Sequence, residues 1–350
     1  MQPTEPAIFD GHNDALVKLY RARTDNPQKL FIEGYDAHVD LPKARAGGFG
    51  GGFFAIFVPP SETGDYSGMA KPEYDLPLPR QLSSDEALPA AIAQAGILLK
   101  LQDEGALKIC HTAADIAACL EAGTLAAIMH MEGAEAIDGD FRALEVLHSA
   151  GLRSLGPVWS RPTMFGHGVP FRYPGTGDIG PGLTDAGHDL VRICNERRIM
   201  IDLSHLNEAG FWDIAKLSTQ PLVATHSNAH ALCPHARNLT DRQLAAVRDS
   251  DGMVGVNFAT AFLRPDGQMK QEADLDNMMR HLDHLIEHLG EDRVGFGSDF
   301  DGAMVPQPIG SVAGLPALRQ AVREHGVDEP LMTKLAHGNW LRVLRLTWGE

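Results

Sequence analysis

The chain is poor in cysteine, in positive charge and in long apolar runs, and each shortage excludes a class of protein. Its four cysteines are scattered without CxxC spacing, so the sequence predicts neither a thiolate zinc site nor a disulfide framework. Lys and Arg number 30 against 46 acidic residues, and the formal charge of -16 repels nucleic acid and anionic lipid surfaces. No stretch reaches the ~20 apolar residues that span a bilayer. We therefore expect no nucleic-acid partner, no membrane attachment and a cytoplasmic location.

Short apolar runs of strand length recur along the 350 residues. Eight are found, at residues 7–9, 53–58, 125–131, 152–159, 199–203, 222–225, 253–258 and 294–297. Helix-like stretches separate most of them, at residues 84–101, 141–150, 184–197, 207–217, 240–248 and 272–289. Several runs are continuously apolar, which is typical of a parallel sheet covered by helices. The pattern predicts the α/β class and a single (β/α)8 TIM-type barrel over residues 1–350, rather than a two-domain doubly wound sheet.

Two segments interrupt this alternation. Residues 59–89 are rich in Pro, Ser, Asp and Tyr, and residues 161–182 carry four prolines and six glycines. Both are predicted to be long loops. Loops that follow barrel strands lie at the carboxyl end, where active sites are built, so these segments are candidates to cover a substrate. For the first segment, simple packing against its neighbours is an equal alternative.

Residues with metal-binding chemistry follow five of the apolar runs. They are His12 and Asp14 after the first run, Glu132 after the third, His205 after the fifth, His226 after the sixth and Asp299 after the eighth. In a barrel these strand ends form one ring around one mouth. Zn²⁺ takes imidazole nitrogen and carboxylate oxygen, and a carboxylate can bridge two ions. The set predicts a two-metal hydrolytic site that lowers the pKa of a shared water.

Single members of this set also have structural explanations. His205 alone could be a hydrogen-bonded core histidine, Glu132 a first-turn helix carboxylate, and Asp299 a turn or helix-capping residue. Separate explanations of this kind would all have to be true at once at five strand ends. Because that coincidence is improbable, the metal site is favoured. His130, two residues before Glu132, is interpreted as filling the barrel interior.

Three further histidines have helical spacing on the stretch before the eighth run. They are His281, His284 and His288. The same spacing occurs in any amphipathic helix that covers a barrel, so we interpret these residues as part of an outer helix rather than as a metal site.

Taken together, the motifs resemble those of the membrane dipeptidase (renal dipeptidase) family of metallopeptidases, within the amidohydrolase superfamily of barrels. The matching motifs are Asp10-Gly11-His12-Asn13-Asp14, Met131-Glu132-Gly133, Asp202-Leu203-Ser204-His205, Thr225-His226-Ser227, Arg237-Asn238-Leu239, His281-Leu282-Asp283-His284 and Gly295-Phe296-Gly297-Ser298-Asp299-Phe300-Asp301-Gly302. The resemblance covers nearly the whole chain. It implies a hydrolase, a metallo-dipeptidase that cleaves small dipeptides, with a C-terminal D-residue among the substrates.

The resemblance also implies a ligand set. Two Zn²⁺ ions are expected, with His12 and Asp14 as ligands of one, His205 and His226 as ligands of the other, and Glu132 as the bridge. A homodimer is expected on the same ground.

Substrate contacts implied by the family are partly changed in this chain. Asp299 corresponds to the proton shuttle and Arg237 to the residue that holds a substrate oxygen or carboxylate. A guanidinium fork suits the carboxylate of a dipeptide. Where the family carries a substrate-contacting histidine after strand four, this chain has Trp159, which cannot accept a proton. Either nearby His167 replaces that histidine or another contact does, and a related amidohydrolase acting on a non-dipeptide amide or lactone is the alternative function.

Overall fold

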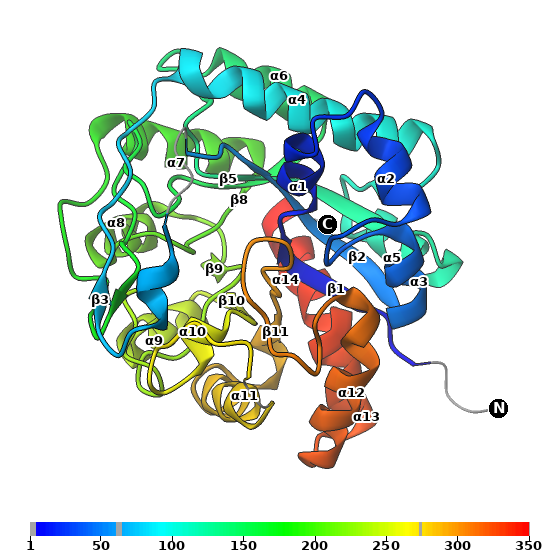
Figure 1. Cartoon of the computed structure of the whole chain (residues 1–350). Helices are drawn as coiled ribbons and strands as arrows, with labels where there is room; N and C mark the ends of the chain where they lie inside the picture. The colour runs from blue at the N-terminus through cyan, green and yellow to red at the C-terminus, as the bar shows by residue number, and fades with distance from the viewer. Residues whose placement is uncertain (1–4, 61–64, 273–274, 350) are drawn as a thin grey trace.

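The computed structural model describes residues 5–60, 65–272 and 275–349 of the chain (Figure 1). The predicted loop at 59–89 and the predicted helix at 272–289 each include a few residues outside these ranges. Among the described residues, no helix is both long and apolar enough to cross a membrane.

Parallel strands curl around a central axis and form two sheets. One sheet runs in the order β1 (Ile8–Asn13), β2 (Phe49–Phe57), β5 (Ala126–Glu132), β6 (Leu152–Gly156) and β8 (Met200–Ile201), with β4 (Lys108–Ile109) beside β5. The other runs in the order β11 (Val294–Phe296), β10 (Met253–Val256) and β9 (Val223–Ala224). Every residue of β2 and β5 is buried, including His130 and Glu132 of β5, as expected for strands of a parallel sheet that is covered on both faces.

Single backbone bridges join the two sheets into a barrel. Asp202 pairs with Val223 between β8 and β9, and Asn13 pairs with Phe300 between β1 and the end of β11. The Asp14 amide donates to the Phe300 carbonyl at 2.8 Å. The predicted barrel is therefore confirmed, and all eight predicted runs supply its strands.

Helices cover the outside of the strands (Figure 1). The six predicted helices are found as α4 (Ser84–Asp103), α6 (Arg142–Ala150), α7 (Asp185–Arg197), α8 (Glu208–Leu217), α9 (Asp241–Asp249) and α11 (Asp276–Leu289). The others are α1 (Ala15–Arg21), α2 (Pro27–Glu33), α3 (Leu41–Gly47), α5 (Ala113–Ala122), α10 (Thr260–Leu263), α12 (Leu315–Glu324), α13 (Glu329–Thr333) and α14 (Asn339–Trp348). Ser83 and Glu86 form a capping box that fixes the start of α4.

The two predicted long loops meet each other. β3 (Tyr74–Asp75) in the first pairs antiparallel with β7 (Arg172–Tyr173) in the second, and Tyr74 lies opposite Tyr173. A short 3-10 helix, Ser67–Ala70, precedes β3. The loops are thus held together by backbone hydrogen bonds on one side of the barrel.

Trp340 of α14 closes the amino end of the barrel. It is fully buried, and its Nε1–H donates to the Phe296 carbonyl at 3.1 Å. Its ring lies 5.1 Å from that of Phe53. A Cβ on Gly11 would lie 2.5 Å from the Trp340 ring, so glycine is required where β1 passes this side chain. Because this end is filled, the open mouth is at the carboxyl ends of the strands.

Candidate metal centre

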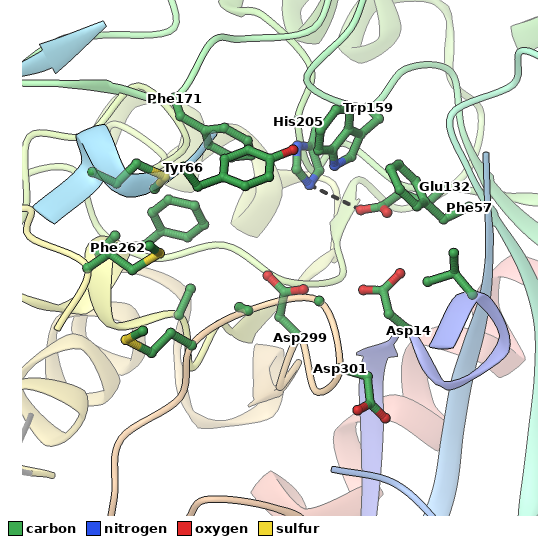
Figure 2. A pocket seen from close by; sticks show the side chains of 18 of the residues that line it. Asp14, Phe57, Tyr66, Glu132, Trp159, Phe171, His205, Phe262, Asp299 and Asp301 are labelled. Atoms are coloured by element: carbon green, nitrogen blue, oxygen red, sulfur yellow. Dashed lines mark ion pairs between the residues drawn. The ribbon is translucent and has the colours of Figure 1, made fainter. Parts of the chain in front are cut away.

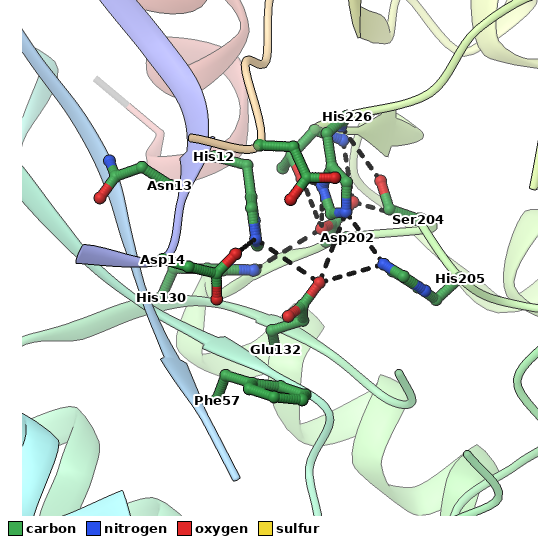
Figure 3. A network of polar contacts seen from close by, with 12 residues as sticks. His12, Asn13, Asp14, Phe57, His130, Glu132, Asp202, Ser204, His205 and His226 are labelled. Carbon is green, nitrogen blue, oxygen red and sulfur yellow. Dashed lines mark hydrogen bonds and ion pairs between the residues drawn. The ribbon is translucent and has the colours of Figure 1, made fainter. Parts of the chain in front are cut away.

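Glu132, the last residue of β5, lies at the centre of the predicted ligands (Figure 3). Its Oε1 lies 3.5 Å from His12 Nε2, 3.1 Å from His205 Nε2 and 3.4 Å from His226 Nε2. Asp14 Oδ2 lies 3.5 Å from His12 Nε2 on the other side. The structure thus brings together all five side chains predicted to bind metal.

Hydroxyl groups behind two of the imidazole rings fix their orientation. Ser160 Oγ lies 2.8 Å from His205 Nδ1, and Thr225 Oγ1 lies 2.8 Å from His226 Nδ1. The Thr225 hydroxyl in turn donates to Asp202 Oδ2 at 2.6 Å. With Nδ1 engaged in this way, Nε2 of each ring faces Glu132 and is free to bind a metal ion.

These supporting residues were missed by the sequence analysis. Asp202 and Thr225 belong to motifs that were noted, and Ser160 follows Trp159, but no role was predicted for any of them. Their adjacency to the ligand histidines in sequence was the available signal.

Asp10 holds the first and last barrel strands together beside the site. Its carboxylate accepts the backbone N–H of Ser298 at 2.6 Å and the Ser298 hydroxyl at 2.7 Å. The next residue, Asp299, donates its amide to the His12 carbonyl at 3.0 Å. Asp299 has a φ of 62°, a left-handed conformation that is costly for a non-glycine residue and is often found at functional sites.

Gly302 allows a close approach between this turn and two carboxylates. A Cβ there would lie 2.1 Å from Asp14 Oδ2 and 2.5 Å from Asp299 Oδ1. Asn257 donates Nδ2–H to Asp299 Oδ2 at 3.0 Å. Asp299 is therefore fixed beside Asp14 with one oxygen hydrogen-bonded.

The electrostatics of the cluster fit a bound cation. Burial raises the pKa of Glu132 well above its ordinary range and lowers the pKa of His205 and His226 well below theirs. For His12 burial also opposes the charged form, but Glu132 and other nearby carboxylates outweigh it and raise the pKa to about 10. A divalent ion supplies the positive charge that these buried carboxylates need.

Unsatisfied polar atoms support the same conclusion. Among the described residues, neither ring nitrogen of His12 has a hydrogen-bond partner, although both are buried. The two Nε2 atoms of His205 and His226 lie 3.1 Å apart. Facing nitrogens of this kind are satisfied by a shared metal or proton, so the donor set fits a metal ion.

Arg237 is buried behind His226. Its Nη2 donates to the His226 carbonyl at 3.1 Å, and its guanidinium lies 5.5 Å from the centre of the Phe262 ring. Its Nε has no partner among the described residues. Burial lowers the pKa of Arg237 to about 10, so the side chain still carries a positive charge at neutral pH.

A cavity of about 400 Å³ opens onto the cluster (Figure 2). Its lining includes the carboxylates of Asp14, Glu132, Asp299 and Asp301 and the aromatic rings of Phe57, Tyr66, Trp159, Phe171 and Phe262. Trp159 is among them, with its ring 5.8 Å from that of His205. His167 is not among the lining residues; its ring lies beside Gly180, about 3.7 Å from the position of a Cβ there.

Two other histidines noted in the sequence, His130 and His281, are buried and have structural contacts. His130 lies inside the barrel, with Nδ1 2.9 Å from Ser154 Oγ, which agrees with the interior placement predicted for it. On α11, His281 Nδ1 accepts the Ala229 N–H at 3.1 Å, and Nε2 contacts the Leu263 carbonyl.

A parallel barrel with imidazoles and carboxylates converging at its open mouth is the arrangement of a metal-dependent hydrolase. The chain belongs to the membrane dipeptidase family, because the sequence profile of membrane dipeptidase (peptidase family M19) matches residues 3–347. The resemblance stated from the motifs is confirmed, and the protein is a hydrolase of the metallo-dipeptidase type.

The chain is also similar to individual known proteins. A metallopeptidase from Rhodobacter sphaeroides, solved with a phosphinate mimic of the dipeptide L-Ala-D-Ala, is 56% identical with a TM-score of 0.96, covering 99% of this chain and 100% of that one. The structure of dipeptidase AC is also 56% identical, with the same coverage and a TM-score of 0.97. An uncharacterised Klebsiella pneumoniae protein from the pqqA 5' region is 51% identical over 73% of this chain and 96% of its own length.

Proposed function

We propose that the chain is a binuclear zinc dipeptidase that hydrolyses small dipeptides, including those with a C-terminal D-residue. The observation that carries this proposal is the position of Glu132. One of its carboxylate oxygens, Oε1, lies within 3.5 Å of His12 Nε2 on one side and of His205 Nε2 and His226 Nε2 on the other. A carboxylate placed between two groups of ligands suits a bridge between two ions. His12 and Asp14 would hold one ion, and His205 and His226 the other.

Two bound ions would polarise the amide carbonyl and lower the pKa of the attacking water. The chain's own residues would supply the rest of the reaction. Asp299 borders the cavity beside Asp14, so its free oxygen can take a proton from the water and return it to the leaving amine. Asn257 would keep the other oxygen fixed, which orients the carboxylate for both transfers.

Arg237 would select for a free C-terminus. Its charged side chain lies next to His226, with a buried N–H that lacks a partner among the described residues. A dipeptide carboxylate would satisfy that donor and pair with the charge. The relative from Rhodobacter sphaeroides, solved with a mimic of L-Ala-D-Ala, supports a D-residue at this end of the substrate.

The proposal is tested with purified protein that is reconstituted with Zn²⁺ and analysed for metal content. A matched panel of L-Xaa-L-Xaa and L-Xaa-D-Xaa dipeptides is then offered, with each product amino acid quantified. We expect two Zn²⁺ per chain and turnover of at least one L-Xaa-D-Xaa member. Protein that holds two ions and cleaves no member would contradict the proposal.

Hydrolysis of another bond is the second candidate function, and Trp159 is the observation that favours it. The indole lines the cavity next to His205, and it cannot stabilise an oxyanion with a charged ring. Adding acylated amino acids, cyclic amides and lactones to the panel separates the two functions, because a dipeptidase will prefer substrates with both a free carboxylate and an amide.

A further inference from the structure

A second cluster of metal-binding side chains lies outside the barrel, between α9 and α11, which are neighbours in the helical layer (Figure 1). His284 and His288 are four residues apart on α11, so their rings share one face of the helix. Their ring centroids are 4.3 Å apart. Asp241, the first residue of α9, faces both rings: its Oδ1 lies 2.8 Å from His284 Nε2 and 3.9 Å from His288 Nε2.

This arrangement separates His284 and His288 from the third histidine of the helix. His281 is turned inward and is occupied by the backbone of Ala229 and Leu263. The other two side chains are 16% and 30% exposed, and that of Asp241 is 49% exposed. An ion from solvent can therefore reach all three.

We propose that His284, His288 and Asp241 form a second binding site for a divalent transition metal ion, of the class of Zn²⁺, Cu²⁺ and Ni²⁺. Two imidazole nitrogens and one carboxylate oxygen are ligands that these ions share. Bonds of ~2.1 Å in a tetrahedral arrangement place neighbouring ligand atoms about 3.4 Å apart. The observed distances of 2.8 and 3.9 Å lie on either side of that value, so small rotations of the side chains would admit the ion.

The expected role of this site is stabilisation of the helical layer. An ion there would join the start of α9 to α11, and α9 begins four residues after Arg237. His281 of α11 also accepts the N–H of Ala229. Ala229 lies, like Arg237, in the segment between β9 and α9. Binding to the folded state alone raises the stability of the fold, and none of the three ligands is among the described residues that line the cavity at the barrel mouth.

The site is tested by calorimetric titration of the metal-loaded enzyme with Zn²⁺, after dialysis has removed loosely bound ions. We expect the wild type to take up one more Zn²⁺ than the His284→Gln/His288→Gln variant. Asp241→Asn should bind that ion about tenfold more weakly, because a neutral amide is a poorer ligand than a carboxylate. The melting temperature of the wild type should rise with added Zn²⁺, and that of the double variant should not.

A matched control is His325→Gln. His325 also lies at the surface next to a carboxylate, with Nε2 2.9 Å from Asp283 Oδ2, and it is not part of the cluster. Its uptake of Zn²⁺ should equal that of the wild type. If the double variant folds poorly, His288→Gln replaces it, because that change removes only the 3.9 Å contact.

Hydrolytic turnover should be unchanged in all of these variants, so the result does not depend on the function proposed for the barrel mouth. Equal Zn²⁺ uptake by the wild type and by the folded double or single variant would overturn the proposal.

Discussion

Ser160 Oγ lies 2.8 Å from His205 Nδ1 and orients the ring of this predicted metal ligand. Ser160 is the residue directly after Trp159. Second-layer contacts of this kind fix the tautomer and direction of a ligand ring. The position occupied by Trp159 in this chain is thus adjacent to a residue that supports the proposed metal site.

Loss of this hydroxyl should weaken metal binding. Ser160→Ala is expected to lower the metal affinity of the site about 10- to 100-fold while the fold is kept, as measured by equilibrium dialysis against a buffered metal series. Ser154→Ala is the matched control, because Ser154 contacts His130, which is not among the five proposed ligands. Equal affinity in Ser160→Ala and the wild type would refute the orienting role.

Asp299 should be needed for the reaction and not for the metal. Asp299→Asn keeps the shape and the hydrogen bond that Asn257 can give to an oxygen, but it cannot accept a proton. We expect kcat to fall about 10²- to 10⁴-fold with the metal content unchanged. A normal rate in this variant would remove the proton-transfer role.

Arg237 should act on the substrate carboxylate. A charge-assisted hydrogen bond contributes about 1.5–3 kcal/mol, so Arg237→Lys, which loses the fork but keeps the charge, is expected to lower kcat/KM about 10- to 100-fold for free dipeptides. The informative comparison is a dipeptide amide, whose C-terminus is neutral. If the substitution lowers kcat/KM equally for both substrates, Arg237 does not bind the carboxylate.

Removal of metal should destabilise the barrel. The proposed ligands come from both sheets, since His12 and Glu132 belong to the first and His205 follows its strand β8, while His226 follows β9 of the second. Binding at 1,000 times the dissociation constant contributes about 4 kcal/mol, so a chelator should lower the melting temperature by several degrees. Glu132→Gln should show a smaller change with the chelator. No change in the wild type would indicate that the ions do not link the sheets.

Much of the site could be predicted because barrel geometry converts sequence order into position. Once a parallel barrel is inferred, the residues after each strand must meet at one mouth, and Glu132, His205 and His226 do so. The short helices α1, α2 and α3 were not predicted, because seven residues make only two turns and carry little periodic signal.

Hydrogen bonds between side chains from separate segments of the chain could not be predicted from the sequence. Asn257 reaches Asp299 from β10's loop, and no motif connects the two. The histidines of α11 show the same limit, since His281 turns inward while His284 faces Asp241 of another helix. Which way each ring points depends on neighbours that the spacing does not specify.

Trp340 has a consequence for the order of events during synthesis. It packs against Phe53 in the cluster that also holds Phe9 of the first strand, yet more than 300 residues separate Phe9 from Trp340. The ribosome adds roughly 5–20 residues per second, so Trp340 is synthesised roughly 15–60 s after the first strands that it covers. During that interval the nascent chain exposes aromatic surface that the finished barrel buries, and exposed apolar surface of this kind makes an unfinished fold prone to aggregate.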